Sequence, residues 1–289
     1  MFRRIAAVLA FATLAACGDT TTYLRESLST SVTSLPFSEG GERFDLYQIR
    51  KTENPSEIAF FVGGSGCTSL SVYLAPYFAA LNPEISIYAV DKKGVSKGAL
   101  GLHCSDTFWE NYAYDTLVER NAIALNAVHK LHPDRTISII GTSEGGPIAT
   151  ALAATHAGVS KLVLIGAGGQ TQRQELEQIL PRPTFEHLQK TVATSPQSVT
   201  DFTLGYPHRY WTSILDHDPR ALMQGLDLPT LILIGEKDES VPVASAAVAQ
   251  SLIKGAELVI WPDADHTFDT PQGPARDQMI ARVGDFILR

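Results

Sequence analysis

The residues whose types and spacing are best suited to chemistry lie in a serine-centred turn within residues 136–146. A run of apolar, mostly β-branched residues ends at Gly141 and leads into Gly-Thr-Ser-Glu-Gly, with Ser143 at its centre. Helix-forming residues follow at 148–154. A strand, a very tight turn and a helix form the setting in which a serine hydroxyl becomes a nucleophile. Gly141 and Gly145 are needed because a Cβ at either position would collide with the neighbouring strand or helix.

A serine nucleophile needs a base and an acid, and both residue types follow later in the chain. An imidazole must accept the serine proton, and a carboxylate must hold that imidazole in one tautomer. Asp238 follows a strand-like run at 230–234, and His266 follows another at 257–261. Catalytic groups in open α/β sheets lie beyond the carboxyl ends of the strands. We therefore expect Ser143, Asp238 and His266 at one end of one sheet.

Other residues of the same types could take these roles. Glu236 and Asp265 are alternative candidates for the acid, since they lie in the same two loops. Among the eight histidines, only His266 directly follows a late strand, and the others are expected on the surface. Residues 216–218, Asp-His-Asp, resemble a metal cluster by residue type alone. Three adjacent side chains converge on one ion only with difficulty, so no metal site is expected.

An oxyanion that develops on the substrate needs backbone N–H donors. One is expected from Glu144, at the start of the helix after the serine. The second is expected from the loop at 63–67, Gly-Gly-Ser-Gly-Cys, with Ser65 as the first choice and Gly66 as the second. This loop lacks the third glycine of a dinucleotide fingerprint and the Lys-Ser or Lys-Thr of a P-loop, so no nucleotide cofactor is expected.

These motifs resemble those of the α/β-hydrolase superfamily, over roughly residues 40–289. The resemblance rests on Gly-Thr-Ser-Glu-Gly-Gly, Gly-Glu-Lys-Asp-Glu-Ser-Val-Pro, Asp-His-Thr-Phe and, after the run at 85–90, Asp-Lys-Lys-Gly-Val-Ser-Lys-Gly. The last loop is similar to the Asp-Arg-Arg-Gly-x-Gly-x-Ser turn of many relatives. Relatives often carry His-Gly at the oxyanion loop, where this chain has Gly63 and Gly64. The resemblance implies an enzyme of the serine esterase, lipase or aminopeptidase type.

Strand-like and helical patterns alternate, which predicts an α/β fold with a mostly parallel, doubly wound sheet. The resemblance implies a small helical cap between strands 6 and 7, and residues 168–226 form a connection far longer than usual. Aromatic residues there would line the acyl pocket or form the core of the cap: Phe185, Phe202, Tyr206, Tyr210 and Trp211. The strand-like runs are 44–49, 57–62, 85–90, 136–140, 161–165, 230–234 and 257–261, and the helical patterns are 111–132, 170–190 (broken at Pro181 and Pro183), 210–226, 242–254 and 272–288.

The N-terminal segment has the pattern of a targeting signal. Within residues 1–16, two arginines precede an apolar stretch too short to span a bilayer, and Leu-Ala-Ala-Cys follows. This ending resembles the lipobox of bacterial lipoproteins, which implies lipidation of Cys17 and a place in the cell envelope, at the outer membrane or facing the periplasm. An ordinary signal peptide is the alternative. Residues 17–40, rich in Ser and Thr, are interpreted as a tether to a domain at 41–289.

Two cysteines remain after Cys17, namely Cys67 and Cys104. Because export places them in an oxidising compartment, they are candidates for a disulfide, with free thiols or catalytic use of Cys67 as alternatives. Removing residues 1–16 takes away two arginines and no acid, which changes the formal net charge from −8 to −10. Such an acidic domain is not expected to bind nucleic acid. The oligomeric state is left open.

Together these features predict a lipid-anchored serine hydrolase that cleaves carboxylic esters in small acyl substrates through Ser143, His266 and Asp238. Peptides and thioesters are cleaved by the same machinery, so a peptidase or thioesterase remains an alternative. Acyl transfer to an acceptor other than water is another. A binding protein that keeps the fold without catalysis is the alternative outside enzymes.

Overall fold

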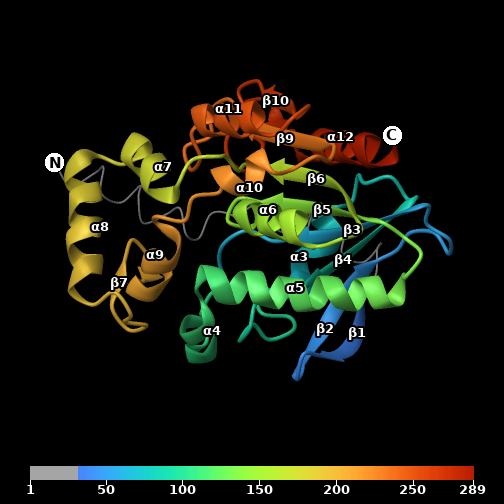
Figure 1. Cartoon of the computed structure of the whole chain (residues 1–289), viewed down its shortest axis with the longest axis horizontal. Coiled ribbons are helices and arrows are strands. Elements are labelled where there is room, and N and C mark those ends of the chain that lie inside the picture. The colour runs from blue at the N-terminus through green and yellow to red at the C-terminus, as the bar shows by residue number, and fades with distance from the viewer. Residues whose placement is uncertain (1–31) are drawn as a thin grey trace.

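The computed structural model describes residues 32–289, which form an α/β fold around one eight-stranded sheet (Figure 1). The strands of the sheet are β1 Thr33–Glu39, β2 Glu42–Ile49, β3 Glu57–Val62, β4 Ile85–Val90, β5 Ile137–Thr142, β6 Val159–Ile165, β9 Thr230–Gly235 and β10 Glu257–Trp261. Their order is β1-β2-β4-β3-β5-β6-β9-β10. The β1–β2 and β2–β4 pairs are antiparallel, and all other pairs are parallel. The predicted mostly parallel sheet is confirmed.

Helices cover both faces of the sheet because its strand residues alternate between two apolar layers. In β3, Ile58, Phe60 and Val62 belong to one layer, whereas Ala59 and Phe61 belong to the other. The first layer includes residues of α5 Tyr114–Leu131, α6 Gly145–Thr155 and α11 Val243–Leu252. The second includes residues of α3 Leu70–Tyr77 and α12 Arg276–Leu288. Figure 1 shows α5 and α6 in front of the sheet.

The cap is one long insertion between β6 and β9, the sixth and seventh strands of the sheet along the chain. In Figure 1 its helices, coloured yellow to orange, stand mainly to the left of the sheet. Thr171 and Gln174 begin its first helix with a reciprocal capping box. The expected break occurs at Pro181, whereas Pro183 lies in the first turn of the next helix, where proline is tolerated. The cap contains α7 Gln172–Ile179, α8 Arg182–Thr194, β7 Phe202–Thr203, β8 Tyr206–Pro207, α9 His208–Ile214 and α10 Arg220–Gln224.

The edge strand β1 corrects the domain boundaries that the sequence suggested. Residues 33–39 fall in the segment interpreted as a tether, yet they pair with β2 along their whole length. The assignment of residues 17–40 to a tether is therefore wrong at its end, and the domain begins before residue 41. An edge strand is half exposed, so its hydrophobic pattern is weak, and Pro36 is acceptable there because one row of N–H groups needs no partner.

Several smaller elements also differ from the expected pattern. The last helix begins at Arg276 and not near residue 272, because residues 269–274 form a short hairpin. Among the described residues, no helix is long and apolar enough to cross a membrane. The signal peptide predicted at 1–16 and the lipidation site Cys17 lie outside the described residues. Besides β1, the elements without a sequence prediction are α3, α4 Asp106–Asn111, β7, β8, β11 Asp269–Thr270 and β12 Gly273–Pro274.

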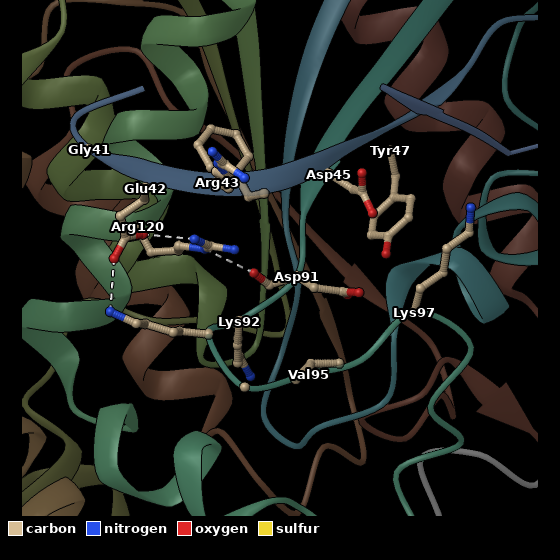
Figure 2. Close-up of a pocket in the computed structure, with 13 residues that line it drawn as sticks. Gly41, Glu42, Arg43, Asp45, Tyr47, Asp91, Lys92, Val95, Lys97 and Arg120 are labelled. Carbon is tan, nitrogen blue, oxygen red and sulfur yellow. Dashed lines mark hydrogen bonds and ion pairs between the residues drawn. The ribbon is translucent and has the colours of Figure 1, made fainter. Parts of the chain in front are cut away.

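A polar pocket of about 520 Å³ lies between the start of β2, the loop after β4 and helix α5 (Figure 2). Charges of both signs line it, and Arg120 donates to Glu42 Oε2 at 2.8 Å and to the carbonyl oxygen of Asp91 at 3.2 Å. None of Ser143, Asp238 and His266 lines this pocket.

A disulfide bond joins Cys67, in the loop after β3, to Cys104, in the loop before α4. The two Cα atoms lie 5.6 Å apart, which is an ordinary separation for this bond. The same two loops are also joined by a backbone hydrogen bond from Ser69 N–H to the oxygen of Ala99, at 2.8 Å. Neither cysteine is a free thiol in the structure, so the alternatives of free thiols and of a catalytic Cys67 are wrong.

Removal of this disulfide is expected to destabilise the protein substantially. The bond closes a loop with a sequence separation of 37, and such a constraint on the unfolded chain stabilises by about 3–4 kcal/mol in the chain-entropy model. Urea unfolding of the double variant Cys67→Ala/Cys104→Ala measures the difference. A reducing agent should lower the stability of the wild type and leave the variant unchanged, and an equal response of both proteins would contradict the prediction.

Candidate active site

The turn between β5 and α6 places Ser143 in a strained backbone conformation. Its φ is +50°, in the left-handed region that residues other than glycine rarely adopt. A Cβ on Gly141 would lie 2.4 Å from the carbonyl oxygen of Gly145, and one on Gly145 would lie 2.2 Å from that of Val62. Both positions therefore accept only glycine, and the crowding expected from the sequence is present.

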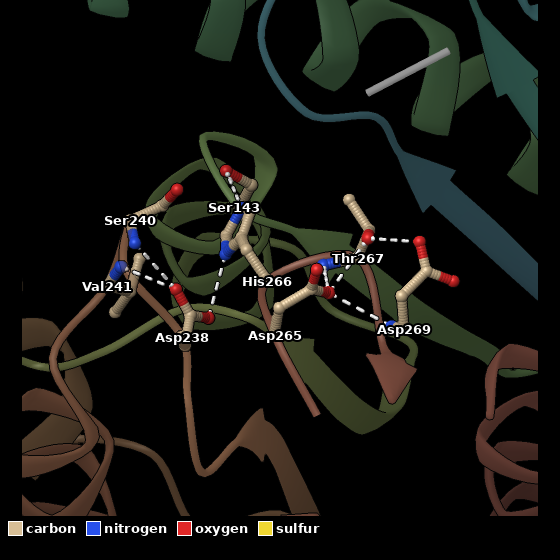
Figure 3. A network of polar contacts seen from close by, with 8 residues as sticks. All are labelled: Ser143, Asp238, Ser240, Val241, Asp265, His266, Thr267 and Asp269. Atoms are coloured by element: carbon tan, nitrogen blue, oxygen red, sulfur yellow. Dashed lines mark hydrogen bonds and ion pairs between the residues drawn. The ribbon is translucent and has the colours of Figure 1, made fainter. Parts of the chain in front are cut away.

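Ser143, His266 and Asp238 form one chain of hydrogen bonds (Figure 3). His266 Nδ1 lies 2.7 Å from Asp238 Oδ2, and His266 Nε2 lies 3.0 Å from Ser143 Oγ. Because a carboxylate only accepts hydrogen bonds, Nδ1 must carry the imidazole proton. Nε2 is then left to accept from the serine hydroxyl. In this arrangement an imidazole can remove the serine proton.

The Asp238 carboxylate is held in place by the backbone of its own loop. Its side chain is 0% exposed. Oδ1 accepts hydrogen bonds from the N–H groups of Ser240 and Val241, both at 2.8 Å, while Oδ2 faces His266. These bonds compensate the burial of the charge and fix the direction of the carboxylate.

The two alternative acids, Glu236 and Asp265, accept hydrogen bonds from residues of the loop after β10. Glu236 Oε2 accepts from a backbone N–H of that loop at 3.0 Å. Asp265 Oδ1 accepts from the N–H and the hydroxyl of Thr267, each at 2.8 Å, and from the N–H of Asp269 at 2.9 Å (Figure 3). Asp265 thereby shapes the loop that carries His266, while Asp238 is the carboxylate that contacts the imidazole.

The small-residue loop after β3 passes directly beside the serine. A Cβ on Gly64 would lie 3.4 Å from Ser143 Cβ, so the loop backbone packs against the turn. The N–H of Gly66 is directed at the hydroxyl oxygen of Tyr112, at 3.4 Å. This contact leaves Ser65 as the better candidate of the two for an N–H that faces the substrate.

A buried polar cluster behind this loop was not found by sequence reasoning. The Glu144 side chain is 5% exposed, pairs with Lys92 Nζ at 2.7 Å and accepts a hydrogen bond from the Tyr112 hydroxyl at 2.6 Å. Burial, followed by the nearby Glu144 carboxylate, raises the pKa of Tyr112 well above its usual value. Lys92 follows β4 as Ser143 follows β5, and this position at the same end of the sheet was the sequence signal that could have indicated the cluster. Tyr112 had no such signal.

Aromatic residues of the cap contact this cluster. Tyr210 stacks on Tyr112, with ring centroids 4.6 Å apart and planes 7° apart, and Tyr206 stacks on Tyr210 at 5.0 Å. Burial raises the pKa of Tyr206, and the neighbouring Ser65 side chain lowers it. Of the other aromatic residues expected in the cap, Phe185 and Trp211 are buried, while Phe202 is exposed. The cap therefore contacts the loop after β3 and the cluster beside it through tyrosines.

No metal centre is formed by the part of the chain that the structure describes. No group of three or more His, Cys, Asp or Glu side chains there is placed to hold an ion. Asp216 instead pairs with Arg173, and Asp218 pairs with Arg220, each at 2.5 Å. The ring of His217 packs on that of Tyr114, with centroids 3.9 Å apart.

Residues 59–281 match the model of the alpha/beta hydrolase family, which is more than half of the chain. The chain belongs to the alpha/beta hydrolase family. A relative described as a non-heme haloperoxidase, from Rhodococcus erythropolis, is 26% identical over 216 residues, which cover 62% of this chain and 75% of that protein. Membership of this family supports a hydrolase activity for this chain.

Solved structures of an esterase and a peptidase share the fold of this chain. An esterase from Exiguobacterium antarcticum aligns with a TM-score of 0.62 and 18% identity, over 89% of this chain and 100% of that chain. The acylaminoacyl peptidase of Pyrococcus horikoshii aligns with a TM-score of 0.63 and 12% identity, over 90% of this chain. This chain spans only 42% of the length of that peptidase. At these identities the likeness shows the fold alone.

This alpha/beta hydrolase also buries a carboxyl group close to the Asp238–His266 pair. Glu175, on the cap helix α7, is 6% exposed, and its Oε1 accepts a hydrogen bond from the Ser245 hydroxyl on α11 at 2.6 Å. Burial raises the pKa of Glu175 from 4.5 to about 7, the bond from Ser245 lowers it, and the Asp238 carboxylate raises it. The folded protein therefore holds this proton across a pH range in which the unfolded chain releases it.

The buried Glu175 predicts a pH-dependent loss of stability that Glu175→Gln removes. Because the folded pKa lies above the unfolded one, the contribution of Glu175 is fully present below pH 4.5 and is lost as the pH rises through about 7. The variant should gain about 3 kcal/mol of unfolding free energy relative to the wild type between these limits. Urea unfolding from pH 4.5 to 8 measures this gain. Glu177→Gln, at an exposed position of the same helix, is the control, and a gain independent of pH would contradict the prediction.

Proposed function

We propose that this protein is a serine hydrolase that cleaves carboxylic esters of small acyl compounds. The observation that carries the proposal is the chain of hydrogen bonds from Ser143 through His266 to Asp238, with distances of 3.0 and 2.7 Å. The left-handed backbone of Ser143, which is tolerated only where the surroundings enforce it, supports the same assignment.

In the first half of the reaction, Ser143 Oγ attacks the carbonyl carbon of the ester while its proton passes to His266 Nε2. Asp238 stabilises the imidazolium that forms. The carbonyl oxygen becomes an oxyanion, which the N–H groups of Ser65 and Glu144 stabilise. When the tetrahedral intermediate collapses, His266 returns the proton to the departing alcohol, and the acyl group stays on Ser143.

In the second half, water replaces the alcohol. His266 Nε2 accepts a proton from water as its oxygen attacks the acyl carbon, and the same N–H groups stabilise the second oxyanion. Collapse of this intermediate releases the carboxylic acid and returns the proton to Ser143 Oγ. The enzyme regains its starting state without a metal or a redox cofactor entering the proton and electron balance.

Amide and thioester substrates fit the same sequence of steps, so a peptidase and a thioesterase are the alternatives. Acyl transfer differs only in the acceptor that replaces water. Initial rates on esters, thioesters and peptidyl anilides of matched acyl length distinguish these activities. A folded protein that turns over none of them would favour the binding protein without catalysis.

We also propose that Cys17 carries a lipid anchor and that the enzyme lies in the bacterial cell envelope. Two arginines, a short apolar stretch and the ending Leu-Ala-Ala-Cys support this anchor. The disulfide between Cys67 and Cys104 supports export independently, because such bonds persist in oxidising compartments.

Substitution of the three proposed catalytic residues is expected to abolish most of the activity. Ser143→Ala and His266→Ala should each lower kcat by a factor on the order of 10⁴ to 10⁶. The double variant should lower kcat little further, because the two residues act as a unit. Asp238→Asn should lower kcat less than Ser143→Ala does, since it disturbs the imidazole tautomer and leaves the nucleophile intact. Ester hydrolysis at saturating substrate measures each effect.

A fluorophosphonate probe tests the same assignment without a known substrate. It should label the wild type on Ser143 alone and leave Ser143→Ala unlabelled. Ser251→Ala, at an exposed position on α11, is the control and should keep its activity and its label. Full activity in Ser143→Ala, or an adduct on another serine, would refute the assignment.

The lipid anchor predicts a different phenotype for Cys17→Ser. Metabolic labelling with an alkyne-bearing palmitate should mark the wild type in a bacterial host, and the variant should lose both the label and its place in the membrane fraction. The variant Cys67→Ala/Cys104→Ala should keep the label, which shows that only Cys17 is acylated. Equal labelling of the wild type and Cys17→Ser would rule out the anchor.

A further inference from the structure

Lys92 contacts both segments that carry the proposed oxyanion donors. Its ammonium group donates to the carbonyl oxygens of Gly64 and Gly66, at 2.5 and 3.1 Å. It also forms the ion pair with Glu144 Oε2 at 2.7 Å. The Lys92 side chain is 14% exposed, so water competes little for these contacts. One cation thus joins the loop after β3 to the residue that follows Ser143.

The bond to Gly64 determines where the N–H of Ser65 points. The carbonyl of Gly64 and the N–H of Ser65 belong to the same planar peptide group, and in a trans peptide they point in opposite directions. While the carbonyl faces Lys92, the N–H of Ser65 must face away from Lys92. The loop packs against Ser143, since a Cβ on Gly64 would lie 3.4 Å from Ser143 Cβ.

The loop has few side chains that could hold this orientation by packing. Three of its four residues at 63–66 are glycines, which have no side chains to pack and allow many backbone conformations. Gly66 itself has a φ of +94°. Rotation of the peptide between Gly64 and Ser65 would exchange the N–H for a carbonyl oxygen, which repels an oxyanion. The two bonds from Lys92 oppose that rotation.

Lys92 is in turn fixed by the residue before it. Asp91 accepts hydrogen bonds from the Ser69 hydroxyl and from the N–H of Leu70, both at 2.7 Å, and Arg120 donates to its carbonyl oxygen. Figure 2 shows Arg120 and Glu42 on the other side of the Asp91 backbone, with the Lys92 side chain directed away from them. The next residue, Lys93, pairs with Glu42 at 2.9 Å and is 45% exposed.

We propose that Lys92 is a positioning residue for the oxyanion hole, which keeps the N–H of Ser65 directed at the carbonyl oxygen bound at Ser143. The inference rests on the proposed function, because it assigns Lys92 a part in the same acyl transfer. Lys92 acts through the loop backbone and does not touch the substrate. Its loss should therefore weaken binding of the tetrahedral intermediate far more than binding of the ester.

Lys92→Met tests this inference with an ester that the wild type cleaves. The variant should lower kcat by about 10²-fold, similar to the loss of one oxyanion donor, with a small change in KM. Affinity for an aryl boronic acid, which forms a tetrahedral adduct on the serine, should fall in proportion to kcat/KM. Lys93→Met is the matched control on the same loop and should retain wild-type kinetics.

A double variant separates positioning from damage by a buried charge. The ammonium group of Lys92 is the ion-pair partner of Glu144 Oε2, so Lys92→Met leaves that buried oxygen without a cation and lowers stability. Lys92→Met/Glu144→Gln removes both charges and should recover thermal stability. Its kcat and its affinity for the boronic acid should stay low, because the carbonyl oxygen of Gly64 still lacks the hydrogen bond from Lys92. Recovery of wild-type kcat in the double variant would overturn the inference.

The remaining outcomes keep this inference distinct from the proposed function. If the wild type hydrolyses esters and Lys92→Met has unchanged kcat and boronic acid affinity, the positioning role is refuted and the hydrolase stands. If kcat and KM change while boronic acid affinity does not, the role is also refuted. If the wild type neither cleaves esters nor reacts with a fluorophosphonate, the proposed function fails, and the role of Lys92 fails with it.

Discussion

The backbone around Ser143 leaves no room for a Cβ at Gly141 or Gly145, and the arrangement of the site depends on that close contact. The carbonyl oxygen of Val62 occupies the space that a side chain at Gly145 would need. Strand β3, strand β5 and helix α6 can therefore meet at one point. As a result, the loop after β3 and the start of α6 both lie next to Ser143. A larger residue at either glycine would push these segments apart, even though it would not touch the side chains of His266 or Asp238.

Close approach requires small residues, and small residues cannot hold a loop in shape by packing. The loop after β3 is instead held through its backbone and through Cys67 at its C-terminal end. Lys92 binds two of its carbonyl oxygens, the Tyr112 hydroxyl accepts from the N–H of Gly66, and Cys67 is covalently bound to Cys104. Each of these partners comes from a different segment of the chain. The conformation of this glycine-rich loop is thus restrained by residues that are distant in the sequence.

The cap contacts the site in two places, at the loop after β3 and near Asp238, and the two contacts differ in kind. Near the loop after β3, Tyr210 stacks on Tyr112, so the contact is aromatic. Near the acid, Glu175 accepts from Ser245 and is close enough for Asp238 to raise its pKa. The first contact is insensitive to pH, whereas the second places an ionisable carboxyl between the cap and α11. The cap is therefore connected electrostatically to the acid–imidazole pair as well as packed over the loop.

Local patterns in the sequence were sufficient for seven of the eight strands of the sheet and for the choice of Ser143, Asp238 and His266 as candidates. Buried parallel strands are continuous apolar runs, and a glycine-flanked serine between a strand and a helix has few other uses, so neighbouring residues carry both signals. Strand β1 escaped prediction because an edge strand buries too little to show a pattern. The partners of Lys92, the burial of Glu175 and the pairing of Cys67 with Cys104 were decided by the tertiary structure. These contacts join residues that are 28, 70 and 37 positions apart, and their energies depend on which loops the topology brings together.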